Sequence, residues 1–259
     1  MEIDSVPAGE KTSFTPSLSA LAERVGTNHK GEKQETAVFL ANPCNPSGGL
    51  LDKKELFQTI KENPGTVWIL DESFINYAGG EKSLLPDAAT LPNLVILHSL
   101  TKFYGMAGIR CGFAVCCAPL AERLRKNLPA WNVNVFAAAV RAILKQPSSW
   151  AEQERTLNRE RRKDLFHRLS ALPGAAVLPS CANFLLFRLS GAPSGLASLL
   201  LKKHGIAVRD CSNYPGLETG GWFRAGVRTP EEHELLERAL RVELDKHAPA
   251  ILRRPPKSA

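Results

Sequence analysis

The sequence predicts an α/β protein: a mostly parallel sheet flanked by helices, followed by a small C-terminal α+β domain. Short apolar runs alternate with longer helical patterns in the first part of the chain, which is typical of a parallel sheet. A length of 259 residues allows one large domain or two modest ones. The hydrophobic content of 44% and the charged content of 23% are ordinary globular values and exclude bulk disorder.

In the first part of the chain, apolar stretches of strand length are separated by turns and helical patterns. Asn63-Pro64-Gly65 ends one helical pattern and Pro119 opens another. The predicted strands are 37–41, 66–70, 94–97 and 112–117, and the predicted helices are 51–62 and 119–126. Ligands bind at the carboxyl ends of strands in such sheets, so polar residues there are candidates for a site.

The second part of the chain begins near Pro147-Ser148-Ser149 and has a different pattern. A long connecting helix is predicted at 149–172, ended by Pro173-Gly174. It is followed by an apolar segment at 175–178, strands at 184–189, 206–208 and 222–228, and helices at 195–204 and 230–246. Strands mixed with helices on one face indicate an α+β domain. We therefore expect domains at 1–147 and 148–250, with a frayed tail at 251–259.

The net charge of +7 and the six cysteines narrow the class of protein. Lys and Arg are dispersed among Asp and Glu, so small anionic ligands fit the charge better than nucleic acid does. No cysteines have C-x-x-C spacing, and no Cys/His cluster has zinc-ligand spacing. The first residues lack the features of a signal peptide, and no apolar stretch could cross a bilayer. These observations predict a reduced, soluble, cytoplasmic protein without metal, nucleic-acid or membrane partners.

Lys102 is the strongest candidate for a reactive residue. It stands in Ser99-Leu100-Thr101-Lys102, just after a predicted strand, and Arg110 follows it. A lone lysine near the start of a helix is usually a solvated surface residue. Here a neighbouring cation would lower the pKa of the amine and make it nucleophilic. Ser99 and Arg110 are suited to binding a phosphate.

Two further candidates follow predicted strands. Asp71 ends the run 66–70, and Asn45 lies in the turn 42–48. The simpler interpretations are that Asp71 caps the next helix and that Asn45 only shapes a Pro-rich turn. A phosphorylated pyridine aldehyde needs a lysine for a Schiff base, an acid for the pyridinium proton and a cation for the phosphate. Asp71, Lys102 and Arg110, in this order along the chain, therefore predict such a cofactor site.

The chain resembles the fold-type I aminotransferases of the class I/II branch, which are dimeric and use pyridoxal 5′-phosphate. The resemblance rests on N-P-C-N-P-S-G at 42–48, D-E-S-F at 71–74, S-L-T-K at 99–102 with Arg110, A-N-F at 182–184 and F-R at 223–224. It implies that this is part of a large cofactor-binding domain plus the small domain, and that the complete protein is a homodimer.

The same resemblance implies a role for each matching residue. Lys102 would carry the cofactor, Asp71 would pair with its ring nitrogen, Asn45 would bind its ring oxygen, Ser99 and Arg110 would bind its phosphate, and Arg224 and Asn183 would bind the substrate carboxylate. Family members usually have Tyr where this chain has Phe74, so one hydrogen bond to the cofactor ring oxygen is expected to be absent.

Two branches of this family act on phosphorylated amino substrates: threonine-phosphate decarboxylases of cobalamin synthesis and histidinol-phosphate aminotransferases. The segments 99–113, 129–134, 209–217 and 223–228 resemble the decarboxylases. That resemblance implies decarboxylation of L-threonine O-3-phosphate to (R)-1-amino-2-propanol O-2-phosphate, with Arg209 on the substrate phosphate. The alternatives are a histidinol-phosphate-type aminotransferase, an inactive fragment of either enzyme, and a structural ion pair between Arg209 and Asp210 or another carboxylate.

The start of the chain departs from the family pattern. About 36 residues precede the first matching strand, and segments 1–6 and 14–25 resemble the strand and helix just upstream of it. The Gly-rich loop and the stacking aromatic ring of the family are therefore expected to be missing. We expect a truncated chain or one completed by another chain, with weak cofactor binding and little turnover on its own.

Overall fold

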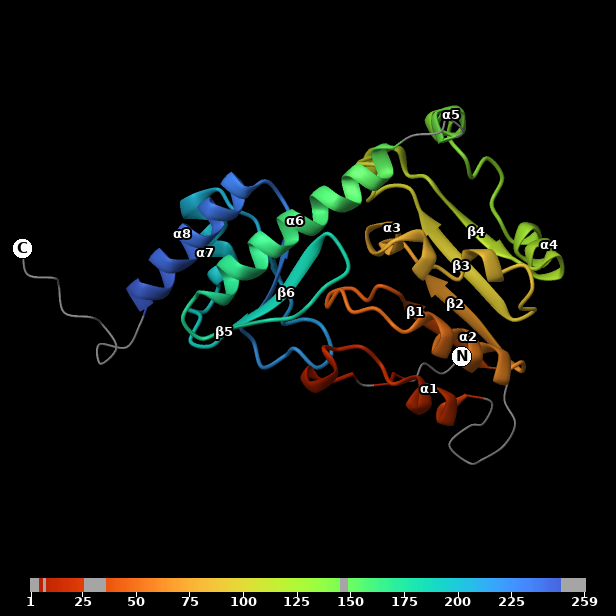
Figure 1. Ribbon diagram of the computed structural model, residues 1–259, viewed down its shortest axis with the longest axis horizontal. Coiled ribbons are helices and arrows are strands. Elements are labelled where there is room, and N and C mark those ends of the chain that lie inside the picture. The colour runs from red at the N-terminus through yellow and green to blue at the C-terminus, as the bar shows by residue number, and fades with distance from the viewer. Residues whose placement is uncertain (1–4, 7, 26–35, 145–148, 248–259) are drawn as a thin grey trace, which may run out of the picture. The chain divides into compact units, whose positions relative to one another are not determined.

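Figure 1 shows the computed structural model, which describes residues 5–6, 8–25, 36–144 and 149–247. The chain forms two compact units, Met1–Thr156 and Leu157–Ala259, and the division falls inside helix α6 (Trp150–Ser170). The tail expected at 251–259 lies outside the described residues. Each unit is described by itself.

The first unit is built on a four-stranded sheet of order β1-β2-β3-β4 (Figure 1). Its strands are β1 (Thr36–Ala41), β2 (Thr66–Asp71), β3 (Leu94–Ser99) and β4 (Gly112–Cys116). β1, β2 and β3 run parallel, and β4 is antiparallel to β3. The four predicted strands are confirmed, and the parallel strands end together, because Ala41, Asp71 and Leu97 are register partners.

Helices α1 (Leu18–Arg24) and α2 (Lys53–Glu62) cover one face of this sheet. Asp52 caps α2 by accepting hydrogen bonds from the backbone nitrogens of Lys54 and Glu55 at 2.9 and 3.0 Å. The apolar core between helices and sheet contains Leu18, Leu21, Val38, Leu40, Leu56, Ile60, Trp68, Leu70, Leu94 and Ile96. The period-2 alternation places the next residues along β1 on the opposite face, where Phe39 is 66% exposed.

Further helices connect and follow these strands: α3 (Ile75–Ala78), α4 (Ala118–Lys126) and α5 (Val135–Leu144), with 3-10 turns at Glu10–Thr12, Gly80–Lys82, Leu85–Asp87 and Ala107–Ile109. The helix expected at 14–25 begins only after Ser17, which caps α1. Of the strand expected at 1–6, residues 1–4 lie outside the described part, and Ser5 and Val6 form no strand.

The second unit has the predicted α+β character. Its antiparallel sheet has the order β5-β6-β8-β7, formed by β5 (Ala175–Val177), β6 (Phe184–Leu189), β8 (Trp222–Gly226) and β7 (Arg209–Asp210). Helices α6, α7 (Leu196–His204) and α8 (Pro230–His247) pack against it. The shared core contains Leu165, Leu169, Leu185, Phe187, Leu200, Phe223, Leu236 and Leu240.

The strand expected at 206–208 is wrong. Gly205, with φ of 68°, ends α7 in the left-handed region, and residues 206–208 are irregular. Strand pairing begins only at Arg209 and Asp210, which lie opposite Arg224 and Phe223 of β8. The apolar pattern of 206–208 reflects packing against the core rather than pairing, because Ile206 and Val208 contact the core cluster of this unit.

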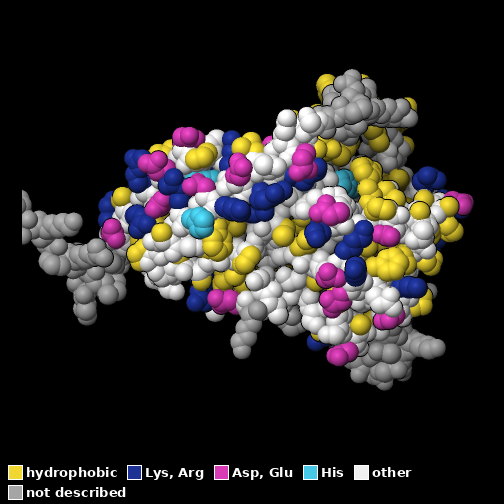
Figure 2. Space-filling view, in the orientation of Figure 1, with side chains coloured by type: hydrophobic (Ala, Val, Ile, Leu, Met, Phe, Trp, Pro, Cys, Tyr) yellow, Lys and Arg dark blue, Asp and Glu magenta, His cyan; other side chains and the backbone are white. Residues whose placement is uncertain are grey.

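The surface carries both signs of charge close together, as the sequence indicated. Figure 2 shows Lys and Arg side chains interspersed with Asp and Glu over the visible face. Many of these charges pair along one helix, such as Arg238 with Glu234 on α8 and Lys126 with Glu122 on α4. Within the described residues, no helix is both long and apolar enough to cross a membrane.

One carboxylate of the second unit is buried and surrounded by cations. Glu243 of α8 has a fully buried side chain and accepts hydrogen bonds from His204 Nε2 at 3.0 Å and Lys203 Nζ at 3.3 Å. Lys246 Nζ lies 3.6 Å from the same carboxylate. The hydrogen bond from His204, followed by the lysines, lowers the pKa of Glu243 to about 2 against the opposing effect of burial.

We expect Glu243→Gln to reduce the acid sensitivity of the second unit. The ordinary pKa of 4.5 exceeds the folded value of about 2, so the unfolded chain binds more protons in this window. The stabilisation from Glu243 is therefore complete above the ordinary pKa and is lost as the pH falls toward 2. Urea unfolding at a series of pH values measures this loss, with Glu234→Gln on the exposed side of α8 as the control. An unchanged pH dependence in Glu243→Gln would contradict the assignment.

Candidate active site

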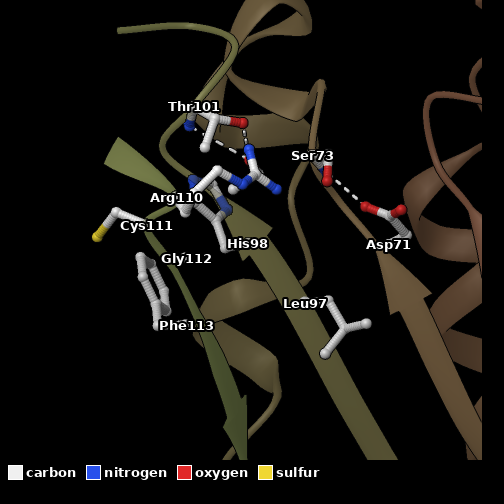
Figure 3. Close-up of a pocket in the computed structure, with 10 residues that line it drawn as sticks. Asp71, Ser73, Leu97, His98, Thr101, Arg110, Cys111, Gly112 and Phe113 are labelled. Atoms are coloured by element: carbon white, nitrogen blue, oxygen red, sulfur yellow. Dashed lines mark hydrogen bonds between the residues drawn. The ribbon is translucent and has the colours of Figure 1, made fainter. Parts of the chain in front are cut away.

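A pocket of about 390 Å³ opens at the ends of β2 and β3 and the start of β4 (Figure 3). It is lined by Asp71, Ser73, Leu97, His98, Ser99, Thr101, Arg110, Cys111, Gly112 and Phe113. This is the carboxyl edge of the parallel strands, where the topology of an open α/β sheet places ligands. Of the residues singled out from the sequence, the pocket brings together Asp71, Ser99 and Arg110.

Asp71 is the last residue of β2 and is half-buried. Its Oδ1 accepts a hydrogen bond of 2.9 Å from the backbone nitrogen of Ser73, the interaction drawn in Figure 3. The structure thus assigns Asp71 a local turn contact rather than a helix cap. Oδ2 has no hydrogen-bond partner among the described residues, so it can accept a hydrogen bond from a protonated ring nitrogen of a ligand.

A chain of hydrogen bonds joins Ser99 to Lys102. Thr101 donates its backbone N–H to Ser99 Oγ at 3.2 Å, and the two hydroxyls share a hydrogen bond of 2.7 Å. Lys102 Nζ donates to Thr101 Oγ1 at 3.1 Å. The amine of Lys102 is exposed and does not line the pocket itself, but Thr101 links it to the pocket wall.

Two aromatic side chains hold the segment that carries Lys102. The ring centre of Phe74 lies 5.6 Å from Lys102 Nζ, a cation–π arrangement. The hydroxyl of Tyr77 donates to the carbonyl oxygen of Lys102 at 3.1 Å. Burial raises the pKa of Tyr77 to about 12, so this phenol stays protonated and keeps its donor role at physiological pH.

Arg110 reaches the pocket from a strained backbone position. Its φ of 56° is in the left-handed region, where a residue with a side chain is uncommon, and its Nη1 donates to Ala107 O at 3.0 Å. The next turn is tight, because a Cβ added at Gly112 would lie 2.8 Å from His98 O. Only glycine at position 112 allows β4 to start this close to β3, which sets Arg110 at the pocket edge.

Asn45 lies near this edge but does not line the pocket. It is exposed in the turn after β1, which contains cis bonds before Pro43 and Pro46. Asn42 Oδ1 fixes the turn by accepting from the backbone nitrogen of Leu51 at 2.9 Å. Because β1 ends level with Asp71 of β2, this turn follows the same carboxyl edge as the pocket.

Seven of the lining residues were not singled out from the sequence, among them His98, Thr101 and Phe113. Thr101 lies inside the S-L-T-K motif, so the sequence could have identified its hydroxyl as a candidate for the site. His98 and Phe113 are register partners in β3 and β4, and their rings stack with centres 5.0 Å apart at 21°. A contact between residues fifteen positions apart on paired strands has no signal in a single sequence.

The second unit brings Arg209 and Arg224 together as register partners in β7 and β8. Arg209 is exposed, and its Nη2 donates to Asn213 Oδ1 at 3.0 Å. Within the described residues Arg209 makes no ion pair with Asp210, whose Oδ1 instead accepts from the backbone nitrogen of Ser212 at 2.9 Å. The structural ion pair considered for Arg209 and Asp210 is therefore wrong.

Arg224 and Asn183 flank the same sheet. The guanidinium of Arg224 lies 5.1 Å from the ring centre of Phe184. Phe184 is in the neighbouring strand β6, where its register partner is Gly226 of β8. Asn183 comes just before β6 and accepts a backbone hydrogen bond from Val227 at 2.8 Å. Like charges on paired strands repel each other, so the Arg209–Arg224 pair is an arrangement that an anion would stabilise.

The first unit fits a phosphorylated pyridine aldehyde as a cofactor. An exposed amine, a carboxylate with one unpartnered oxygen, two hydroxyls and a guanidinium lie along one sheet edge, contributed by Lys102, Asp71, Ser99, Thr101 and Arg110. These are the groups that such a cofactor needs for attachment, for its ring nitrogen and for its phosphate. The described residues contain no cluster of three or more His, Cys, Asp or Glu side chains that would suit a metal ion.

Comparisons with known proteins agree with this geometry. The chain is 35% identical over 218 residues to threonine-phosphate decarboxylase of Salmonella typhimurium, which covers 82% of the chain and 59% of that protein. It is 34% identical over 203 residues to an adenosylcobalamin biosynthesis bifunctional protein of Leptospira interrogans, covering 78% of the chain and 23% of that protein. It is 32% identical over 199 residues to histidinol-phosphate aminotransferase of Methanothermobacter thermautotrophicus, covering 75% of the chain and 52% of that protein. The chain thus spans less than two thirds of each of these relatives.

Solved structures share the fold. L-threonine-O-3-phosphate decarboxylase from Porphyromonas gingivalis matches with a TM-score of 0.73 and 29% identity, covering 80% of the chain and 64% of that structure. A histidinol-phosphate aminotransferase from Sinorhizobium meliloti in complex with pyridoxal-5′-phosphate matches with a TM-score of 0.80 and 22% identity, covering 95% of the chain and 65% of that structure. The family model for aminotransferase class I and II matches residues 1–241. The chain therefore belongs to the pyridoxal-phosphate-dependent aminotransferase class I and II family.

Proposed function

We propose that this chain is the larger part of a pyridoxal 5′-phosphate enzyme that decarboxylates L-threonine O-3-phosphate to (R)-1-amino-2-propanol O-2-phosphate. Its substrate carries two anionic groups, a carboxylate and a phosphate. The observation that carries the proposal is the cross-strand pair of Arg209 and Arg224, which offers two guanidinium groups on neighbouring strands. The 35% identity to a threonine-phosphate decarboxylase supports the same substrate.

In this proposal the two arginines divide the anionic groups of the substrate. Arg224, half-buried against the ring of Phe184, binds the carboxylate together with Asn183. Arg209, exposed and oriented by Asn213 at 3.0 Å, binds the phosphate. Guanidinium groups suit both anions because their N–H donors form paired hydrogen bonds. Holding the substrate at both anions also fixes which bond at its Cα is placed for cleavage.

The residues of the first unit hold the cofactor in this proposal. Bound pyridoxal phosphate supplies an electron sink for the bond that breaks at the substrate Cα. The Nζ of Lys102 is its attachment point and carries the proton that Cα receives. The free Oδ2 of Asp71 keeps the ring nitrogen protonated, while Ser99 and Arg110 bind the phosphate and Asn45 binds the ring oxygen. Phe74 has no hydroxyl for the ring oxygen and contacts Lys102 instead.

A homodimeric complete protein is part of this proposal. Several large apolar side chains of the first unit are strongly exposed, among them Phe39, Trp131, Val133, Val135 and Phe136. Four of these side chains lie within the segment 131–136, and large exposed apolar patches are typical of interaction sites. A second copy of the complete protein is the partner that the family resemblance suggests, with the cytoplasm as its location.

The second candidate is a histidinol-phosphate-type aminotransferase, supported by the 32% identity to such an enzyme. The same residues could carry out this transamination, because an arginine pair also suits a substrate with one phosphate and a co-substrate with two carboxylates. Measuring carbon dioxide from L-threonine O-3-phosphate, and glutamate from histidinol phosphate with 2-oxoglutarate, separates the two candidates. We expect carbon dioxide in the first assay when the complete protein is used. Glutamate formation in the second, without carbon dioxide in the first, would overturn the proposed function.

A further inference from the structure

His98 is a buried residue in the wall of the pocket. It lies between Leu97 and Ser99 in β3, its side chain is 9% exposed, and it lines the pocket. Its Nδ1 is buried and has no hydrogen-bond partner among the described residues. Buried polar atoms are nearly always paired, so an orphaned nitrogen at a pocket wall indicates a missing ligand atom.

The hydrogen bonds of the ring define what that atom must be. The amide nitrogen of Asn76 lies 3.2 Å from His98 Nε2. An amide nitrogen only donates, so Nε2 is the acceptor and the proton of the neutral ring is on Nδ1. Burial lowers the pKa of His98 and so favours this neutral form. The orphaned Nδ1 is therefore a donor, and its missing partner is an acceptor.

The ring of His98 is fixed in position. It stacks on Phe113 of β4 with centres 5.0 Å apart at 21°, and Asn76 holds its other nitrogen. His98 and Phe113 leave the sheet on the face opposite Ser99, and the pocket extends past the strand end, since residues of both faces line it. Figure 3 shows His98 on the same side of the pocket as Arg110 and Phe113, across from Asp71.

The surroundings of His98 favour a negatively charged acceptor. Arg110 supplies a guanidinium at the pocket wall, and Ser99 and Thr101 supply hydroxyls. The one carboxylate among the lining residues, Asp71, is on the other side in Figure 3. A phosphate oxygen is the acceptor that matches a cation, hydroxyls and an imidazole N–H together.

We propose that His98 is a further binding residue of this pocket, donating its Nδ1–H to a phosphate oxygen that Arg110 also binds. The phosphate is that of the cofactor or a free phosphate ion, and the two sources are separated by the experiment. The inference rests on the proposed function only in taking the pocket as a phosphate site. It does not depend on which reaction the enzyme catalyses.

Two substitutions separate the two ring nitrogens. The side-chain amide nitrogen of asparagine lies where Nδ1 of a histidine lies, and that of glutamine reaches the position of Nε2. His98→Asn therefore keeps the proposed donor, and His98→Gln removes it while keeping a polar atom toward Asn76. If His98 only fills the core, both substitutions should change phosphate affinity equally. His167→Gln, in the second unit, is the matched control.

The affinities of each variant for pyridoxal phosphate, pyridoxal and inorganic phosphate are measured by titration calorimetry, with thermal melting to confirm folding. We expect His98→Gln to weaken pyridoxal phosphate binding by roughly 10- to 150-fold, the effect of one hydrogen bond to a charged group. Pyridoxal binding should be unchanged, and His98→Asn should remain close to the parent protein. Weakened binding of inorganic phosphate alone would support the proposal with free phosphate as the source.

Three outcomes would overturn the role of His98: equal losses in both variants, an equal loss for pyridoxal and pyridoxal phosphate, or no binding of any phosphate by the parent protein. None of these readouts involves turnover. A failure of the decarboxylation assay with a selective loss in His98→Gln would overturn the proposed reaction and leave the role of His98 standing. Normal decarboxylation together with unchanged phosphate affinity in His98→Gln would overturn the role of His98 and leave the proposed reaction standing.

Discussion

Lys102→Ala should abolish covalent attachment of pyridoxal phosphate and lower turnover by at least about 100-fold, the lower end of what a positioned proton-transfer group contributes. The variant loses the Nζ that donates to Thr101 at 3.1 Å and the only amine joined to the pocket wall in the described structure. Stability should change by less than about 0.5 kcal/mol, because the side chain is exposed and its removal leaves no cavity. The visible absorption of the cofactor and borohydride trapping of the adduct measure the loss.

Lys102→Arg tests separately whether the amine itself or only its positive charge is needed. Arginine keeps the positive charge near the ring of Phe74 but has no amine that condenses with an aldehyde. We expect it to be as inactive as Lys102→Ala, while the exposed Lys61→Ala on α2 remains active. If Lys102→Arg retains a trappable adduct and normal turnover, another residue is the attachment point.

Arg209→Gln should lower kcat/KM for the phosphorylated substrate by roughly 10- to 150-fold, since it removes a charge-assisted hydrogen bond worth about 1.5–3 kcal/mol. The expected loss is selective: any slow reaction with unphosphorylated threonine should be unaffected, because that substrate lacks the group that Arg209 binds. Arg209→Lys should recover part of the rate, since it restores the charge without the forked geometry. Steady-state kinetics on both substrates measure the selectivity.

Arg238→Gln is the matched control for Arg209→Gln. It also replaces an exposed arginine of the second unit, one that pairs with Glu234 along α8. We expect no change in kcat/KM. An equal loss with both substrates in Arg209→Gln would mean that the residue shapes the β7–β8 pair rather than binding phosphate.

The sequence predicted the sheet edge well because strand ends and their polar residues are local features. Asp71 and Ser99 close apolar runs, and both are the last residues of their strands in the structure. The family motifs then placed Arg110 at the same edge, and the pocket includes all three. Local pattern and resemblance together were sufficient for the parts of the site that lie on one stretch of chain each.

What the sequence could not provide are contacts made across the fold. The stacking of His98 on Phe113 depends on the register of β3 with β4, and the hydrogen bond from Tyr77 to Lys102 O spans 25 positions. The short strand β7 was placed three residues too early, because its apolar neighbours at 206–208 pack on the core. The proposed roles of Asn45 and Asn183 remain predictions, because neither lines the pocket described here.

The segment between α4 and α5 carries a natural optical probe. Trp131 is 98% exposed, whereas Trp150 is 41% exposed and Trp68 and Trp222 are 0% and 2% exposed. Its emission should therefore be red-shifted and open to iodide quenching, in contrast to the signal of the buried indoles. Any molecule that covers this segment, a second chain included, will shift that emission to shorter wavelength and shield it from iodide. Association can then be followed in dilute solution without attaching a label.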